Sequence, residues 1–242
     1  MSSGQNKLNN FIIQKNSNIP LLHGKMFTGV GSQKTPPVYR EFMAAISYVL
    51  GVKGYGLRSG RARGADNFFE IGVPAQMRDL AEIYLPKKGF GVATGCRSFE
   101  IEDANVLMEA MYIIDKNNIH EAWQHLINKR GDSFAVAAHT RNVFQCLGIV
   151  LRAQSLSKFL ICWTPCGSKT FEETTEFTGG TRTAIRLADV SGIPVFNLAV
   201  REDAVRLHKM ILEFKKHNPI PFEVPTIRDL EPYFTKRKRA LK

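Results

Sequence analysis

Three glycine-containing segments of the chain combine a permissive backbone with hydroxyl or cationic side chains. They read GVGSQKTP over residues 29–36, RSGRARGAD over 58–66 and TGGTRTA over 178–184. Glycine lets a ligand approach the backbone closely. The helix that each segment is expected to begin presents unpaired N–H groups and a partial positive charge. This combination binds anions, above all phosphate.

If the three segments meet, residues from all of them would hold the ligand. A residue at the end of the strand that precedes the third segment would join them. The residues expected to bind phosphate or another part of the ligand are Gly29, Gly31, Ser32, Gln33, Lys34, Ser59, Gly60, Arg61, Arg63, Gly64, Asp66, Thr164, Gly179, Gly180, Thr181, Arg182 and Thr183. The alternative is purely structural, because glycines are common at strand ends and Arg58, Arg61 and Arg63 could be solvated surface charges. Asp66 either lies in a first helical turn, stabilised by the helix dipole, or hydrogen-bonds a ribose hydroxyl, and we favour the first.

The elements that would position these segments alternate between short apolar runs and amphipathic ones. Strands are expected over residues 24–32, 55–60, 81–86, 158–165 and 193–199, and helices over 38–50, 64–77, 178–192 and 202–216. This alternation predicts a Rossmann-like α/β fold, with a doubly wound, mainly parallel sheet of about five or more strands. In such a sheet every strand-to-helix turn lies at the carboxyl edge, so the three segments would share one crevice.

The stretch over residues 87–152 contains no convincing strand, and its apolar residues recur at helical spacing. We expect a helical insertion over about 87–132, between the third and fourth strands, followed by a crossover helix. His139, Arg141 and Asn142 on that helix either lean over the crevice as a lid or face water.

The whole chain is then organised around one domain. Residues 1–24 are expected to form a loosely ordered arm, 25–217 a single Rossmann-like domain, and 218–242 an extension that ends in the basic tail KRKRALK. The net charge of +11 predicts attraction to polyanions such as nucleic acid or nucleotides, unless it only solubilises the protein.

Other sequence features argue against metal binding and membrane insertion. The four cysteines have neither zinc-knuckle nor C-x-x-C spacing. His120 and His125 are five residues apart, which separates them by about 140° around a helix, so no metal is predicted. No apolar run suits a signal peptide or a membrane span, and we expect a soluble cytoplasmic protein.

The motifs resemble those of the SMF/DprA–LOG superfamily of Rossmann-like domains. The matching residues are G-V-G-S at 29–32, S-G-x-A-x-G-A-D at 59–66, G-G-T-x-T-A-I-x-x-A at 179–188, G-I-P-V-F at 192–196, H-T-R-N-V-F-Q-C-L-G at 139–148 and C-W-T-P at 162–165. They extend roughly from Phe27 to Leu198 and look most like the DNA-processing-protein-A-like branch often carried by phages.

The resemblance implies a function that the residues alone do not. It suggests a non-catalytic protein that binds single-stranded DNA or a nucleotide, with a role in DNA recombination and a recombinase as partner. It also implies a homodimer or higher homo-oligomer, no cofactor, and, if the chain is phage-encoded, a location in the host cytoplasm.

Two departures from the family pattern bear on the site, the first on a direct phosphate contact and the second on catalysis. Gln33 replaces the arginine that usually follows glycine-serine, with Lys34 next to it. Arg186 falls where the phosphoribohydrolase branch has its glutamate, and a cation cannot take over a carboxylate's part in glycosidic cleavage.

The remaining carboxylates in this region leave an enzymatic alternative open. Glu172, Glu173 and Glu176 could supply an acid or base in the crevice, or they form a solvated loop. The alternative function is an enzyme or sponge for a nucleotide-derived small molecule, either an N-glycosidic bond hydrolase similar to phosphoribohydrolases or a binder of a nucleotide signal.

Overall fold

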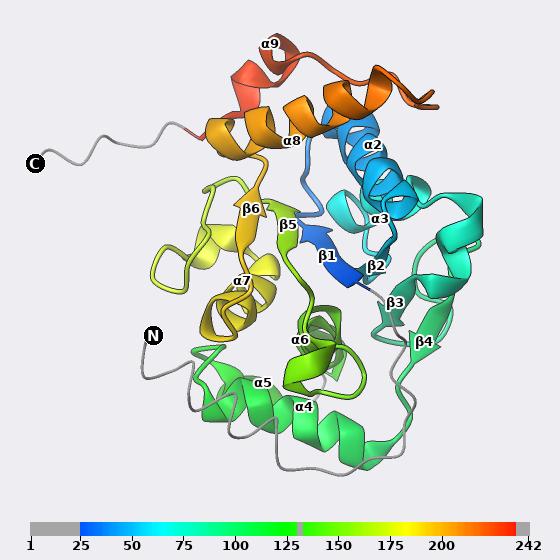
Figure 1. Ribbon diagram of the computed structural model, residues 1–242. Helices are drawn as coiled ribbons and strands as arrows, with labels where there is room; N and C mark the ends of the chain where they lie inside the picture. Colours follow the sequence, from blue (N-terminus) through cyan, green and yellow to red (C-terminus); the bar gives the residue numbers. More distant parts are fainter. Residues whose placement is uncertain (1–24, 130–132, 236–242) are drawn as a thin grey trace, which may run out of the picture.

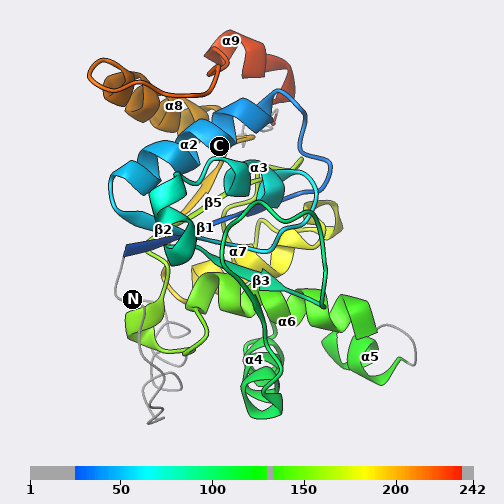
Figure 2. The same cartoon turned by 90° about the vertical axis from the view of Figure 1, so that its right-hand side faces the viewer.

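The fold is described from a computed structural model, over residues 25–129 and 133–235. The predicted N-terminal arm at 1–24 and the basic tail at 236–242 lie outside the described residues. The fold is an α/β sandwich in which one central sheet carries helices on both faces (Figures 1 and 2).

The central sheet has six strands, all parallel, in the order β4-β3-β2-β1-β5-β6. The strands are β1 (Lys25–Gly31), β2 (Tyr55–Ser59), β3 (Glu82–Leu85), β4 (Ser98–Glu100), β5 (Leu160–Trp163) and β6 (Val195–Asn197). The predicted Rossmann-like parallel fold is confirmed. The strand order reverses between β1 and β5, which is where open α/β sheets form their ligand crevice.

Helices cover the two faces of the sheet unequally. The elements outside the sheet are α2 (Tyr39–Val52), α3 (Ala65–Ile71), η1 (Ala75–Leu80), α4 (Ala104–Lys116), α5 (Trp123–Asn128), α6 (Ser133–Leu147), η2 (Ala153–Ser155), η3 (Glu176–Thr178), α7 (Thr181–Val190), α8 (Arg201–Lys215), α9 (Ile227–Leu230) and η4 (Glu231–Tyr233). Figures 1 and 2 show α2, α3 and α8 on one face and α6 and α7 on the other. Helices α4 and α5 pack outside α6 and do not reach the sheet centre.

Each face of the sheet has its own apolar core. Because successive strand residues point to opposite faces, β1 sends Phe27 into the core under α2 and α3, and Val30 into the core under α6 and α7. Both side chains are almost fully buried. The carboxyl end of β1 is thus anchored on both sides.

Two expectations about the elements were wrong. The stretch over 87–152 does contain a strand, because Ser98–Glu100 pairs with β3 as an edge strand, and α4 to α6 therefore connect β4 to β5. Ser-Phe-Glu alternates polar and apolar residues, but three residues, two of them exposed, are too short to give a strand signal in the sequence. The helix expected over 64–77 ends at Ile71, and Pro74 precedes a separate 3₁₀ helix. Proline disfavours helical backbone in the residue before it, which explains the break.

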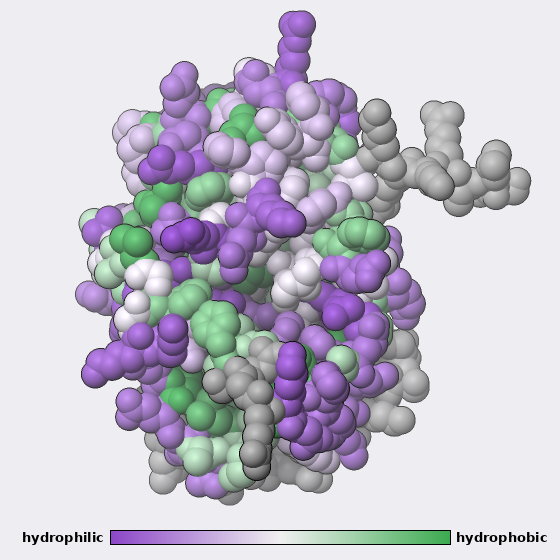
Figure 3. Space-filling model, turned by 180° about the vertical axis from the view of Figure 1, so that it is seen from behind, coloured by the Kyte–Doolittle hydropathy of each residue, from purple (hydrophilic) through white to green (hydrophobic). Residues whose placement is uncertain are grey.

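The surface seen from behind is largely hydrophilic (Figure 3). Hydrophobic side chains appear there in small patches scattered among hydrophilic ones, in both the upper and the lower half of the view. Within residues 25–129 and 133–235, no helix combines the length and the apolar character that a bilayer crossing requires.

Candidate functional site

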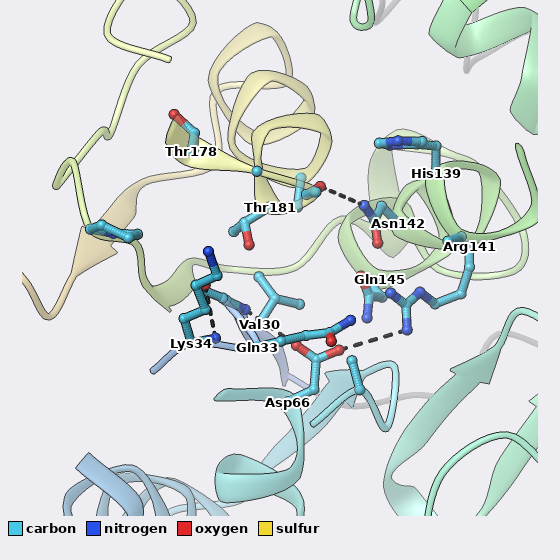
Figure 4. A pocket seen from close by; sticks show the side chains of 18 of the residues that line it. Val30, Gln33, Lys34, Asp66, His139, Arg141, Asn142, Gln145, Thr178 and Thr181 are labelled. Atoms are coloured by element: carbon cyan, nitrogen blue, oxygen red, sulfur yellow. Dashed lines mark hydrogen bonds and ion pairs between the residues drawn. The ribbon is translucent and has the colours of Figure 1, made fainter. Parts of the chain in front are cut away.

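A cavity of about 560 Å³ opens at the carboxyl edge of the sheet, where β1 and β5 lie side by side. Its lining comes from the turn after β1, from α6, and from the glycine turn that begins α7 (Figure 4). Volumes of about 300–1,000 Å³ are usual for small-molecule sites. Ala62 and Asp66 of the second segment also line it, so all three predicted glycine segments contribute to one cavity.

The turn after β1 is held in place by backbone hydrogen bonds. The Ser32 N–H donates to the Trp163 carbonyl at 3.0 Å, and the Lys34 N–H donates to Ser32 Oγ at 3.0 Å. A Cβ at Gly31 would lie 2.8 Å from the Trp163 carbonyl oxygen, so the turn approaches β5 as closely as only glycine allows. Gln33 and Lys34 are exposed and line the cavity.

The glycine turn before α7 presents a helix N-terminus to the cavity. Gly179 has a φ of 64°, Gly180 is the N-cap, and Thr181 begins the ten-residue helix. The first turn of α7 contains no acidic residue to neutralise its partial positive charge. Asn142 Nδ2 donates to the Gly180 carbonyl at 3.1 Å and ties this turn to α6. The geometry is that of an anion-binding helix end.

The three residues that were expected on the crossover helix as a lid line the cavity and are held there. His139 Nδ1 lies 2.7 Å from Thr183 Oγ1, and Arg141 Nη1 donates to the Gly60 carbonyl at 2.6 Å. Burial, helped by the neighbouring His120 and Arg182, lowers the pKa of His139 to about 4, so its ring is neutral near pH 7.

Asp66 forms the floor of the cavity and is 2% exposed. Its Oδ1 accepts the Gly31 N–H at 3.2 Å, and its Oδ2 lies 3.7 Å from Arg141 Nη1. Burial raises the pKa of Asp66 to about 6, although the charge of Arg141 and the Gly31 N–H act in the opposite direction. Asp66 lies in the first turn of α3, as expected, and it also faces the cavity (Figure 4).

Gln145 is a buried polar residue of this site that the sequence analysis missed. It lies one turn of α6 beyond Arg141, is 1% exposed and lines the cavity. Figure 4 shows its side chain between Arg141 and Asp66. Its spacing of four residues from Arg141 and three from Asn142 places it on the same helix face, which is the signal that could have identified it.

The predicted ligand-binding residues divide into two groups. Those that line the cavity are Gly31, Ser32, Gln33, Lys34, Asp66, Gly179, Gly180 and Thr181, joined by Glu176, His139, Arg141 and Asn142. Those outside its lining are Gly29, Ser59, Gly60, Arg61, Arg63, Gly64, Thr164, Arg182 and Thr183, with Glu172 and Glu173. The second glycine segment thus contributes Ala62 and Asp66 to the lining, while its other residues lie outside it.

The arginines of the second segment are explained mostly by structure. Arg61 is buried, and its Nε and Nη2 donate to Glu70 Oε1 at 3.0 and 2.8 Å. Arg58 is buried against Glu82, with 2.6 Å between Nε and Oε2. Arg63 is exposed. Two of the three guanidinium groups are therefore occupied by buried carboxylates.

Other predicted contacts also serve the framework. Ser59 Oγ donates to the Gly29 carbonyl at 2.6 Å, which joins β2 to β1. Thr164 is fully buried, and its Oγ1 accepts from Asn197 Nδ2 at 2.7 Å. Arg182 Nη1 lies 3.5 Å from Glu121 Oε2 at the outer side of α7.

Arg186 lies where the phosphoribohydrolase pattern would place a glutamate. Its side chain is buried and donates to Thr174 Oγ1 at 2.6 Å, to the Ile119 carbonyl at 3.2 Å and to Glu121 Oε1 at 2.7 Å. It is not part of the cavity lining. Among the described residues, no group of three or more His, Cys, Asp and Glu side chains is arranged to hold a metal ion.

Comparison of the chain with protein-family models, with curated proteins and with solved structures gives no match. The Rossmann-like parallel sheet is established by the structure itself. The family resemblance drawn from the motifs remains a prediction.

Proposed function

We propose that this protein binds a small phosphorylated ligand of nucleotide size in the cavity at the end of β1 and β5. The observation that carries the proposal is the glycine turn at Gly179–Gly180. It directs the N-terminus of α7, free of acidic residues in its first turn, into the same cavity as Lys34. A helix N-terminus together with a lysine is a recurrent arrangement for phosphate.

The size of the cavity favours a free nucleotide over a DNA strand. About 560 Å³ is enough for one nucleotide, whereas single-stranded DNA is usually bound along an open basic groove that spans several nucleotides. The net charge of +11 supports attraction to either ligand. If the ligand is DNA, we extend the proposal to what the motif resemblance implies. That is a role in recombination, a recombinase partner and a homo-oligomer.

A second candidate is hydrolysis of an N-glycosidic bond, and the carboxylates of Asp66 and Glu176 in the cavity lining favour it. Such cleavage needs one group to protonate the leaving base and another to activate water or stabilise the cationic sugar. The raised pKa of Asp66, about 6, suits a group that exchanges protons near neutral pH. Loss of free base production in the variant Asp66→Asn, with nucleotide binding intact, would support this candidate.

The binding proposal is tested by calorimetric titration of the protein with 5′-AMP and 5′-GMP. In the variant Lys34→Ala, affinity should fall about tenfold to a hundredfold, because a charge-assisted hydrogen bond to phosphate contributes about 1.5–3 kcal/mol. Lys53→Ala is the matched control, since Lys53 is also exposed but does not line the cavity.

A salt series with labelled oligothymidylate separates the nucleotide from the DNA version. For DNA, log affinity should fall steeply with log salt as counterions are released, and free nucleotides should compete poorly. If neither nucleotide binds, and Lys34→Ala and Lys53→Ala behave alike with oligothymidylate, the cavity is not the phosphate site.

A further inference from the structure

The cavity contains a buried amide beside Asp66. No hydrogen bond of good geometry joins Oε1 or Nε2 of Gln145 to a residue that the structure describes, although the residue is only 1% exposed and a weak interaction with Gln145 lowers the pKa of Asp66. An unpaired buried polar group destabilises a fold, so its presence at a cavity indicates a hydrogen-bond partner supplied from the cavity, by water or by a ligand.

The surroundings of Gln145 restrict what that partner can be. On one side lies the Asp66 carboxylate, whose Oδ1 already accepts the Gly31 N–H. On the other lies Arg141, whose Nη1 is occupied by the Gly60 carbonyl. A Cβ at Gly60 would lie 2.3 Å from Gln145 Nε2, so the backbone of the second glycine segment closes a further side of the amide. The open direction is the cavity.

We propose that Asp66 and Gln145 form a subsite for the nucleoside part of the ligand. The part of the nucleoside that this subsite binds carries two hydrogen-bond donors next to an acceptor. This inference rests on the proposed function and adds the residues that determine which nucleotide the site prefers. An ionised carboxylate only accepts, and an amide accepts at oxygen and donates at nitrogen. Asp66 and Gln145 together therefore accept two N–H or O–H groups and donate one N–H.

Two parts of a nucleotide present this pattern. The cis-diol of ribose offers two O–H donors and acceptor oxygens, and the edge of guanine offers two N–H donors beside a carbonyl oxygen. The edge of adenine offers one donor and one acceptor, and the sugar of a deoxynucleotide has lost one hydroxyl. The subsite therefore discriminates either ribose from deoxyribose or guanine from adenine.

The test compares the affinities of 5′-GMP, 5′-dGMP, 5′-AMP and 5′-dAMP, measured by calorimetry with the full-length protein. A ribose subsite should favour both ribonucleotides about tenfold or more over their deoxy forms. A guanine subsite should instead favour both guanine nucleotides by a similar factor. In Gln145→Leu most of that preference should disappear, whereas Gln124→Leu, on the exposed side of α5, should keep it.

The preference is a ratio within one variant, so a merely destabilised Gln145→Leu protein would lower all four affinities and leave the ratio unchanged. Equal affinities of the native protein for all four nucleotides would overturn the subsite and leave the phosphate site intact. Failure of all four to bind would overturn the proposed function and the subsite together.

Discussion

The raised pKa of Asp66 makes the stability of the fold depend on pH, and this dependence can be measured without knowing the ligand. The pKa of Asp66 is raised from 3.8 to about 6 in the folded protein, chiefly because its carboxyl group is buried. The folded state therefore holds the Asp66 proton more tightly than the unfolded state. The free energy of unfolding must fall as the pH rises through this window.

The size of the effect follows from the pKa shift. One pKa unit corresponds to about 1.4 kcal/mol, so the shift to about 6 predicts a loss of about 3 kcal/mol once the pH is well above 6. The loss is absent below the unfolded value of 3.8. About 2 kcal/mol of it should develop between about pH 4.5 and about pH 7.5.

Urea unfolding of the native protein and of Asp66→Asn across that pH range isolates the contribution. Asparagine does not titrate, and its oxygen can still accept the Gly31 N–H. The unfolding free energy of the native protein minus that of the variant should decrease by about 2 kcal/mol as the pH rises. The control is Asp79→Asn, which removes an exposed carboxylate of η1 and so gives the effect of losing a surface charge on the unfolding free energy. A difference that increases with pH would mean that Arg141 outweighs burial and would refute the reasoning.

Two further predictions concern the second glycine segment. Arg61→Met should lower the unfolding free energy by about 3–5 kcal/mol, because it leaves the fully buried Glu70 carboxylate unpaired, whereas Arg63→Ala should change it by less than about 0.5 kcal/mol. Equal effects in chemical denaturation would show that the Arg61–Glu70 pair does not contribute to the fold. Gly64→Ala should destabilise by about 3 kcal/mol or more, since φ is 77° and the new Cβ would lie 2.5 Å from the Ser32 carbonyl oxygen. Gly54→Ala, with φ of 83° but open space around it, should lose only about 1–2 kcal/mol, and a thermal melt that ranks the two glycines the other way contradicts this account.

The sheet and the position of the cavity could be predicted because they follow from the order of the elements. Buried apolar strands separated by helices give a parallel sheet, and a parallel sheet gathers its strand-to-helix turns at one edge. The sequence could also have ended α3 earlier, because Pro74 restricts the backbone of the residue before it. The strand Ser98–Glu100 depends on its pairing with the edge of β3, because the alternation of its own three residues is too short to identify a strand.

The direction of each side chain could not be predicted, and it determines the site. Arg61 and Lys34 look equivalent in the sequence, as cations in glycine turns. Packing turns Arg61 away toward Glu70, nine residues along the chain, and leaves Lys34 at the cavity. Gln145 is an ordinary polar residue of a helix until the fold brings it near Asp66, from a distant part of the chain. Such relations depend on tertiary contacts and not on local spacing.

The central claim is that one cavity, between the turn after β1 and the start of α7, holds a phosphorylated ligand. Hydrogen–deuterium exchange with and without saturating 5′-GMP tests it most directly, because exchange reports where the backbone is protected. We predict slower exchange in peptides that cover residues 29–35 and 176–184, and unchanged exchange in α4 and α8. Protection confined to other segments, or none in a sample that binds the nucleotide, would contradict the account.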